Sequence, residues 1–237
     1  MPTVLQLAKD FIGLFYPEVC ICCGEGLGTK EDLVCTMCIY KLPKTNFHTA
    51  ADNPLAKVFW GRVDVNAVSA YCHYQKGNMV QDLVHELKYK GKKELGIDIG
   101  KWYGHDLKTS PLFNKADYIL YIPLHPSKLR KRGYNQSACF AEGLSKSMGI
   151  AVLHDALSRI KNTDTQTRKS RYERWENVEG IFKVDMIEEL KGKHVLLVDD
   201  IITTGATIEA CLVELNKVPV SAVSVAAIGC ADTITAI

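Results

Sequence analysis

The stretch that decides the fold is His194-Val195-Leu196-Leu197-Val198-Asp199-Asp200-Ile201-Ile202-Thr203-Thr204-Gly205-Ala206-Thr207. An apolar run leads directly into two carboxylates, which are followed by a Thr/Gly turn and an apolar helical pattern. This order predicts a buried strand over residues 195–199 and a helix over residues 205–215. In a parallel α/β sheet, ligands bind at the carboxyl ends of the strands, where this order places both carboxylates.

The turn over residues 203–207 carries groups that bind a phosphate monoester. It offers free backbone N–H groups, threonine hydroxyls and the positive end of a helix dipole. Two adjacent carboxylates repel each other, so we expect Asp199 and Asp200 to accept hydrogen bonds from a diol or to face a magnesium ion. The alternative is an incidental acidic pair before a helix cap, which explains neither the five-residue loop nor its place after an apolar strand.

The rest of the chain extends this strand into a sheet. Further strands are predicted over residues 65–74, 118–122, 150–153 and 222–228, and helices over residues 3–15, 79–89, 95–107 and 136–148. Such alternation, with apolar strands, predicts an α/β fold in which helices cover both faces of a parallel sheet. We expect two domains, an N-terminal helix and ribbon over residues 1–50 and the α/β domain over residues 51–237.

Composition and charge exclude several classes of protein. With 237 residues, of which 47% are hydrophobic and 24% charged, the chain is neither disordered nor fibrous. The formal charge of +2 is too small to imply nucleic-acid binding by itself. Because the sequence has neither a run of about 18 apolar residues nor a signal-peptide pattern, we expect a cytoplasmic protein without membrane insertion.

Four of the nine cysteines form two C-x-x-C pairs near the N-terminus. In a reducing compartment this spacing favours a metal site over a disulfide framework, and four thiolates suit a closed, tetrahedral, structural Zn²⁺ site. Cys22 interrupts the first pair and is predicted to be a spectator. Ordinary buried thiols or a redox pair are the alternatives. The predicted zinc ligands are Cys20, Cys23, Cys35 and Cys38.

The other cysteines stand singly among apolar neighbours. A free cysteine in such surroundings behaves as a small hydrophobic residue. Burial in the core is therefore predicted for Cys72, Cys139, Cys211 and Cys230.

Residues 195–207 resemble the signature of type I phosphoribosyltransferases that binds 5-phosphoribosyl 1-pyrophosphate (PRPP). In that family the acidic pair holds the ribose 2- and 3-hydroxyls, and the following loop wraps the 5-phosphate. The resemblance implies a type I phosphoribosyltransferase-like sheet and Mg²⁺ bound together with PRPP. It also implies a catalytic role for Asp199 and Asp200, which would bind PRPP together with Thr203, Thr204, Gly205, Ala206 and Thr207.

A second resemblance covers nearly the whole chain. Four segments precede the PRPP signature in a fixed order: the four-cysteine ribbon, the run HELKYKG over residues 85–91, the run RGYNQ over residues 132–136, and Gln166 with Arg174 and the run NVEG over residues 177–180. Taken in this order, the set is similar to the ComF family, which is named for its part in competence for DNA uptake. Residues 231–237 depart from the pattern because they lack a basic residue behind the last strand.

Two basic segments are further candidates for binding anions. Residues 128–132 follow the predicted strand 118–122, where phosphoribosyltransferases bind pyrophosphate, although a solvated basic helix face is the plain alternative. Residues 158–180 are polar and aperiodic and correspond to the flexible loop of the family. Their arginines alternate with Tyr172 and Trp175, a composition that also suits stacking with single-stranded DNA, unless the loop is simply solvated. The candidates for pyrophosphate or nucleic-acid contact are Lys128, Arg130, Arg132, Arg168, Lys169 and Arg171.

Three functions remain open. The favoured one is a PRPP-binding, phosphoribosyltransferase-related protein of DNA uptake that contacts single-stranded DNA and a competence helicase. The second is a phosphoribosyltransferase, of the glycosyltransferase class, that transfers phosphoribose to a small-molecule acceptor, and the third is a PRPP-sensing regulator. The sequence leans toward an enzyme, but it holds no recognisable signature of an acceptor pocket.

Overall fold

The computed structural model describes residues 18–160 and 180–232. Its main sheet has five strands in the order β1-β7-β6-β2-β3, and all neighbouring strands are parallel. The predicted parallel sheet is confirmed. The strands are β1 (Ala67–Tyr74), β2 (Tyr118–Tyr121), β3 (Ala151–Val152), β6 (His194–Ile202) and β7 (Ala222–Ala231).

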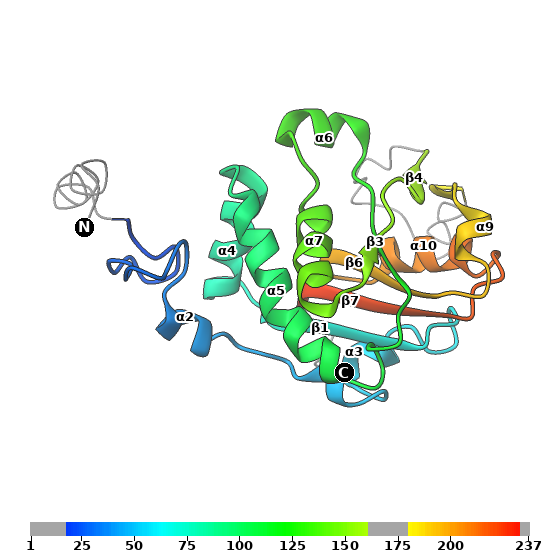
Figure 1. Cartoon of the computed structure of the whole chain (residues 1–237), viewed down its shortest axis with the longest axis horizontal. Helices are drawn as coiled ribbons and strands as arrows, with labels where there is room; N and C mark the ends of the chain where they lie inside the picture. The colour runs from blue at the N-terminus through cyan, green and yellow to red at the C-terminus, as the bar shows by residue number, and fades with distance from the viewer. Residues whose placement is uncertain (1–17, 161–179, 233–237) are drawn as a thin grey trace.

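Helices cover both faces of the sheet, as predicted. Side chains of the central strand β6 alternate between two hydrophobic clusters, with Leu196 and Val198 in one and Val195 and Leu197 in the other. This is the pattern of a strand that is buried on both faces. Figure 1 shows α4 (Met79–Tyr89), α5 (Lys93–Thr109) and α7 (Gln136–Met148) side by side. The opposite face is covered by α3 (Pro54–Lys57) and α10 (Ala206–Leu215).

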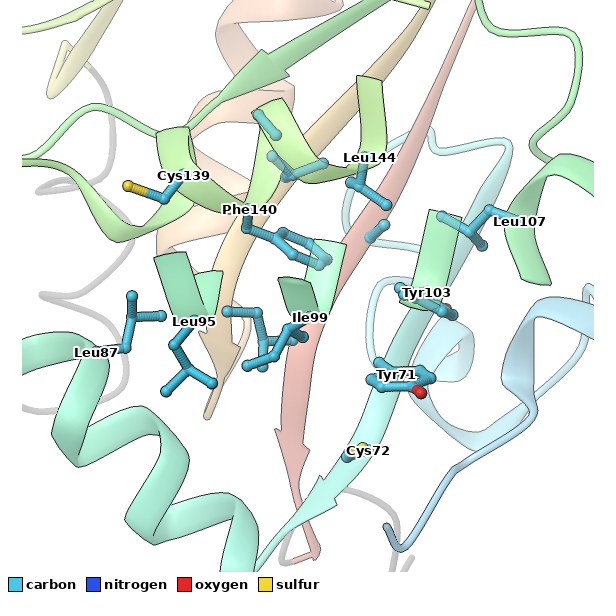
Figure 2. Packing of buried hydrophobic residues seen from close by; sticks show 14 of the residues in the cluster. Tyr71, Cys72, Leu87, Leu95, Ile99, Tyr103, Leu107, Cys139, Phe140 and Leu144 are labelled. Atoms are coloured by element: carbon cyan, nitrogen blue, oxygen red, sulfur yellow. The ribbon is translucent and has the colours of Figure 1, made fainter. Parts of the chain in front are cut away.

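Helices α5 and α7 pack unusually closely because glycines stand at their contact. Gly96, Gly100 and Gly104 recur every four residues along α5, so they lie on one face of the helix. A Cβ atom on Gly100 would lie 2.3 Å from the Phe140 oxygen of α7. Figure 2 shows the side chains of Ile99, Tyr103, Phe140 and their neighbours around this contact.

Strand β6 is longer than predicted. Instead of ending at Asp199, it continues to Ile202 because β7 continues beside it, with Ile201 opposite Gly229 and Ile202 opposite Cys230. The acidic pair therefore lies within the last part of the strand. Residues before and after the pair are both paired with β7.

Several short elements were not predicted from the pattern. Strands β4 (Leu157–Arg159) and β5 (Phe182–Val184) pair in a separate antiparallel sheet, although residues 158–180 were expected to be one loop. The expected helix over residues 3–15 lies outside the described residues. The other short elements are α2 (Thr36–Tyr40), η1 (Phe47–Thr49), α6 (Pro126–Arg132) and α9 (Ile187–Leu190).

Two further expectations concern burial and membranes. The four isolated cysteines, Cys72, Cys139, Cys211 and Cys230, are all buried, as predicted. Within residues 18–160 and 180–232, the helices are too short or too polar for any of them to span a bilayer.

Candidate functional site

The loop between β6 and α10 forms an open hollow at the carboxyl end of the sheet. Thr203, Thr204, Ala206 and Thr207 are exposed, and the loop ends at the amino terminus of the ten-residue helix α10. Free backbone N–H groups and the helix dipole make such a terminus favourable for an anion. The hollow is lined by Asp199, Ile201, Ile202, Thr203, Thr204, Gly205, Ala206, Thr207 and Ile208.

Gly205 is required at its position in this loop for two reasons. Its φ of +77° lies in the left-handed region, which favours glycine. In addition, a Cβ atom on Gly205 would lie 2.9 Å from Cζ of the fully buried Phe59. The segment that carries Phe59 is tied to α10, because Arg62 Nε donates to Glu209 Oε1 at 3.2 Å. The segment that contains Phe59 and Arg62 therefore packs against the loop and fixes its position.

The two carboxylates of the acidic pair have different partners. Asp199 Oδ1 accepts hydrogen bonds from Ser137 Oγ at 3.0 Å and from the Asp200 backbone N–H at 2.8 Å. Asp200 Oδ2 forms an ion pair with Lys88 Nζ at 2.8 Å, and its Oδ1 accepts from the Ile201 N–H at 2.6 Å. Ser137 of α7 therefore holds Asp199 and Lys88 of α4 holds Asp200, and both helices lie on the same face of the sheet.

Burial, together with the adjacent charge of Asp200, raises the pKa of Asp199 to about 7. Hydrogen bonds from the Asp200 N–H and Ser137 oppose this shift without cancelling it. Asp199 therefore changes charge near neutral pH, whereas Asp200 has a cation beside it. A carboxyl group with such a pKa can accept or donate a hydrogen bond to a ligand hydroxyl.

The predicted basic candidates lie in different environments. Lys128 and Arg130 are exposed on α6, which stands at the top of Figure 1. Arg132 is half-buried, with its guanidinium 5.5 Å from the centre of the Tyr89 ring. It also donates to Gln136 Oε1 at 2.8 Å. The structure thus places Arg132 beside the end of α4, and Arg168, Lys169 and Arg171 lie outside the described residues.

His125 has a structural role. It is the N-cap residue of α6, where its Nδ1 lies 3.3 Å from the Ser127 backbone N and 2.7 Å from Ser127 Oγ. This is how a side chain caps a helix, because it satisfies an N–H group of the first turn.

Two residues that contact the acidic pair were missed as site residues. Lys88 lies in the HELKYKG run, and Ser137 directly follows the RGYNQ run. Both runs were recognised only as family markers. Their positions at the end of α4 and the start of α7, next to the carboxyl edge of the sheet, were the signal that they face the site.

The four predicted zinc ligands come together in the N-terminal ribbon. The Sγ atoms of Cys20, Cys23, Cys35 and Cys38 all lie within 4.8 Å of one another. Those of Cys23 and Cys35 are 3.8 Å apart. Zn–S bonds of about 2.3 Å in a tetrahedron place sulfurs about 3.8 Å apart, so the cluster fits Zn²⁺.

Backbone donors favour the thiolate form of Cys20, whereas burial raises the pKa of Cys38. Burial alone would raise the pKa of the Cys20 thiol, but hydrogen bonds from the Cys35, Cys23 and Cys22 backbones outweigh it and lower the pKa to about 6. The Cys35 N–H, for example, donates to Cys20 Sγ at 3.3 Å. Burial raises the pKa of Cys22 to about 12, and Cys22 is not part of the cluster.

The chain is similar in sequence to proteins named for DNA utilization and for competence. Residues 135–231 match the family model described as a phosphoribosyl transferase domain. The DNA utilization protein YhgH of Escherichia coli K12 is 26% identical over 88% of each chain. Competence protein F of Haemophilus influenzae is 31% identical over 51% of this chain and 53% of its own length. Competence protein ComFC of Bacillus subtilis is 29% identical over 61% of this chain and 58% of its own. The chain is therefore similar to competence proteins F and ComFC and to YhgH, in agreement with the predicted resemblance to the ComF family.

The family-model match covers only part of the candidate site. It begins at Asn135, the N-cap residue of α7, and ends at Ala231 in β7. It therefore includes Ser137, both carboxylates and the loop over residues 203–207. Lys88 and the four-cysteine cluster lie outside it.

Proposed function

We propose that this chain binds PRPP in the hollow between β6 and α10, as part of a role in DNA uptake. The observation that carries this proposal is that Asp199 and the threonine loop line one open hollow, with Asp200 directly beside Asp199 in β6. A phosphorylated ribose needs acceptors for its diol next to donors for its phosphate, and this hollow provides both.

Each part of the ligand has a counterpart in the site. The 5-phosphate would lie against the exposed loop over residues 203–207, where backbone N–H groups and threonine hydroxyls donate to its oxygens. The ribose 2- and 3-hydroxyls would donate to Asp199 and Asp200. Mg²⁺ would accompany the pyrophosphate, whose oxygens are the hard ligands this ion prefers.

If the chain is a transferase, its reaction breaks the bond between C1 of the ribose and the pyrophosphate oxygen. The electron pair of that bond leaves with pyrophosphate, and a nucleophile then attacks the oxocarbenium-like carbon. The chain's own contribution would be to hold the ribose and to stabilise the developing charge, with Asp199 and Asp200 on the diol. The alternative functions, which would use the same hollow, are a phosphoribosyltransferase with a small-molecule acceptor and a PRPP-sensing regulator.

The proposed role in DNA uptake rests on the names of the relatives and on the basic surface of α6. The exposed Lys128 and Arg130 project from this helix, and we propose that they contact single-stranded DNA together with Arg168, Lys169 and Arg171. A competence helicase would be the protein partner in the cytoplasm. In this proposal the zinc ribbon is structural.

The test is calorimetric titration of PRPP with Mg²⁺ into the zinc-loaded protein. Replacing Asp199 and Asp200 together with Ala should remove most of the affinity, because hydrogen bonds to charged groups contribute about 1.5–3 kcal/mol each. The control is Glu188→Ala with Glu189→Ala, an exposed acidic pair on α9. Equal affinity of wild type and the Asp199/Asp200 variant would contradict the proposal.

A further inference from the structure

The contact between Lys88 and Asp200 joins α4 to the acidic pair across 112 positions of sequence, from 88 to 200. Lys88 Nζ lies 2.8 Å from Asp200 Oδ2, and the side chains are only 20% and 15% exposed. A surface lysine rarely holds one geometry, because its side-chain entropy opposes the contact. Here the low exposure of both partners and the short distance indicate a built contact.

The backbone that carries Lys88 is fixed by the residues on either side of it. The Tyr134 hydroxyl donates to the carbonyl oxygen of Leu87, and the Arg132 guanidinium lies over the ring of Tyr89. Arg132 and Tyr134 both lie just before α7. The first turn of α7 contains Ser137, the partner of Asp199. Lys88 and Ser137 are therefore positioned together around the acidic pair.

An ammonium at Asp200 changes what else this carboxylate can bind. A divalent cation at Asp200 would lie within a few Å of the Lys88 charge, and the two cations repel each other. Only one of the three N–H donors of Lys88 is needed by Asp200 Oδ2. The others can donate to a sugar hydroxyl that itself donates to the carboxylate.

We propose that Lys88 is a specificity-determining residue that serves as the built-in counter-cation of Asp200, so that the acidic pair takes the diol of a ribose 5-phosphate group without a divalent metal. This inference rests on the proposed function and specifies its ligand chemistry. Mg²⁺ that arrives with PRPP is then held by the pyrophosphate of the ligand and not by the acidic pair.

The charge on the other carboxylate agrees with this assignment. Two charged carboxylates attract a divalent ion, but burial and the neighbouring charge raise the pKa of Asp199 to about 7. Near neutral pH, the group of Lys88, Asp199 and Asp200 therefore carries a net charge between zero and minus one. A neutral or singly charged group suits an uncharged diol better than it suits Mg²⁺.

The experiment uses ribose 5-phosphate, which has the diol and the 5-phosphate but no pyrophosphate to carry a metal. Its affinity for the zinc-loaded protein is measured by calorimetry in a buffer freed of divalent metals on a chelating resin beforehand, and again in the same buffer with added Mg²⁺. The variants are Lys88→Met and Lys88→Arg. The control is Lys108→Met, an exposed lysine in the last turn of α5.

Wild type, Lys88→Arg and Lys108→Met should bind equally well, within about twofold, with and without Mg²⁺. Lys88→Met should bind about tenfold or more weakly without Mg²⁺ and regain affinity when it is added. Wild-type binding that requires Mg²⁺, or unchanged metal-free binding by Lys88→Met, overturns the role of Lys88 but leaves the proposed site intact. Absence of wild-type binding under both conditions overturns this inference, and the titration of PRPP with Mg²⁺ decides separately whether the proposed function holds.

Discussion

Gly100 and Gly143 bring the backbones of α5 and α7 into direct contact. A Cβ atom on Gly100 would lie 2.8 Å from the Cα of Gly143, and one on Gly143 would lie 2.0 Å from the carbonyl oxygen of Ile97. Because these helices belong to the face that carries α4 and Ser137, their spacing also sets the position of the groups around the acidic pair.

Replacing Gly143 with Ala should destabilise the fold despite the better helix propensity of Ala. The propensity gain is about 1 kcal/mol, but a methyl group against backbone atoms forces the helices apart, and such overpacking costs about 1–3 kcal/mol or more. We expect a net loss in the free energy of unfolding, measured by urea denaturation. The exposed neighbour Glu142→Ala should change it by less than about 0.5 kcal/mol. A Gly143→Ala variant as stable as Glu142→Ala would show that the contact is loose.

Replacing Asp199 with Asn should stabilise the protein in a pH-dependent way. The pKa of about 7 in the folded protein exceeds the unfolded value of about 3.9, so the wild type loses stability as the pH rises from about 4 to 7. The Asn variant escapes this loss, so its advantage should be about 1–3 kcal/mol at pH 8 and vanish toward pH 4. Thermal or urea unfolding across this range measures it, with the exposed Asp64→Asn as control. An advantage that grew toward acid pH would be the wrong sign.

The ribbon should contain one zinc per chain, bound by the four clustered thiolates. Cys35→Ser should lose the metal, whereas Cys22→Ser should keep it, because Cys22 lies outside the cluster. Metal analysis of the purified variants decides both points. Stoichiometric loss of zinc in Cys22→Ser, or full retention in Cys35→Ser, would mean that the ligand set is different.

Binding of single-stranded DNA should weaken steeply as salt increases. If phosphate neutralisation drives it, the slope of log affinity against log salt should be about −0.7 per neutralised phosphate. Replacing Arg168, Lys169 and Arg171 with Ala should weaken binding and flatten the slope. Trp175→Ala should weaken binding at unchanged slope, because stacking releases no counterions. Fluorescence anisotropy with a labelled oligonucleotide measures both quantities, and no binding at low salt would remove the DNA contact from the proposal.

Sequence patterns predicted those elements well whose bounds are set by local signals, namely a capping residue and an apolar face. The helices over residues 79–89 and 136–148 were predicted with their observed bounds, because each begins after an asparagine cap and has an apolar face. The strand through the acidic pair was predicted too short. Its last residues are strand because β7 pairs with them, which is a long-range cause that no local pattern contains.

The site was also predicted only in part, because local patterns do not contain long-range contacts. The acidic pair and the loop over residues 203–207 are contiguous, so one stretch of sequence contains them. Lys88 and Ser137 reach Asp200 and Asp199 from distant parts of the chain, and their contacts depend on how α4 and α7 are packed. Helical periodicity shows which face of α4 is buried, but it does not show that Lys88 in the last turn contacts the carboxylate of Asp200.

The strand order has a consequence for how the chain folds during its synthesis. In the described sheet, β1 pairs with β7 alone, and β2 pairs with β6 and the two-residue strand β3. After β1 is made, the ribosome must add roughly 150 residues before β7 begins, which takes about 7–30 s at 5–20 residues per second. Throughout that interval β1 lacks its partner strand β7, and β2 lacks β6 until residue 194 has been made. The nascent chain is therefore most exposed to aggregation and to chaperones just before its last strands appear.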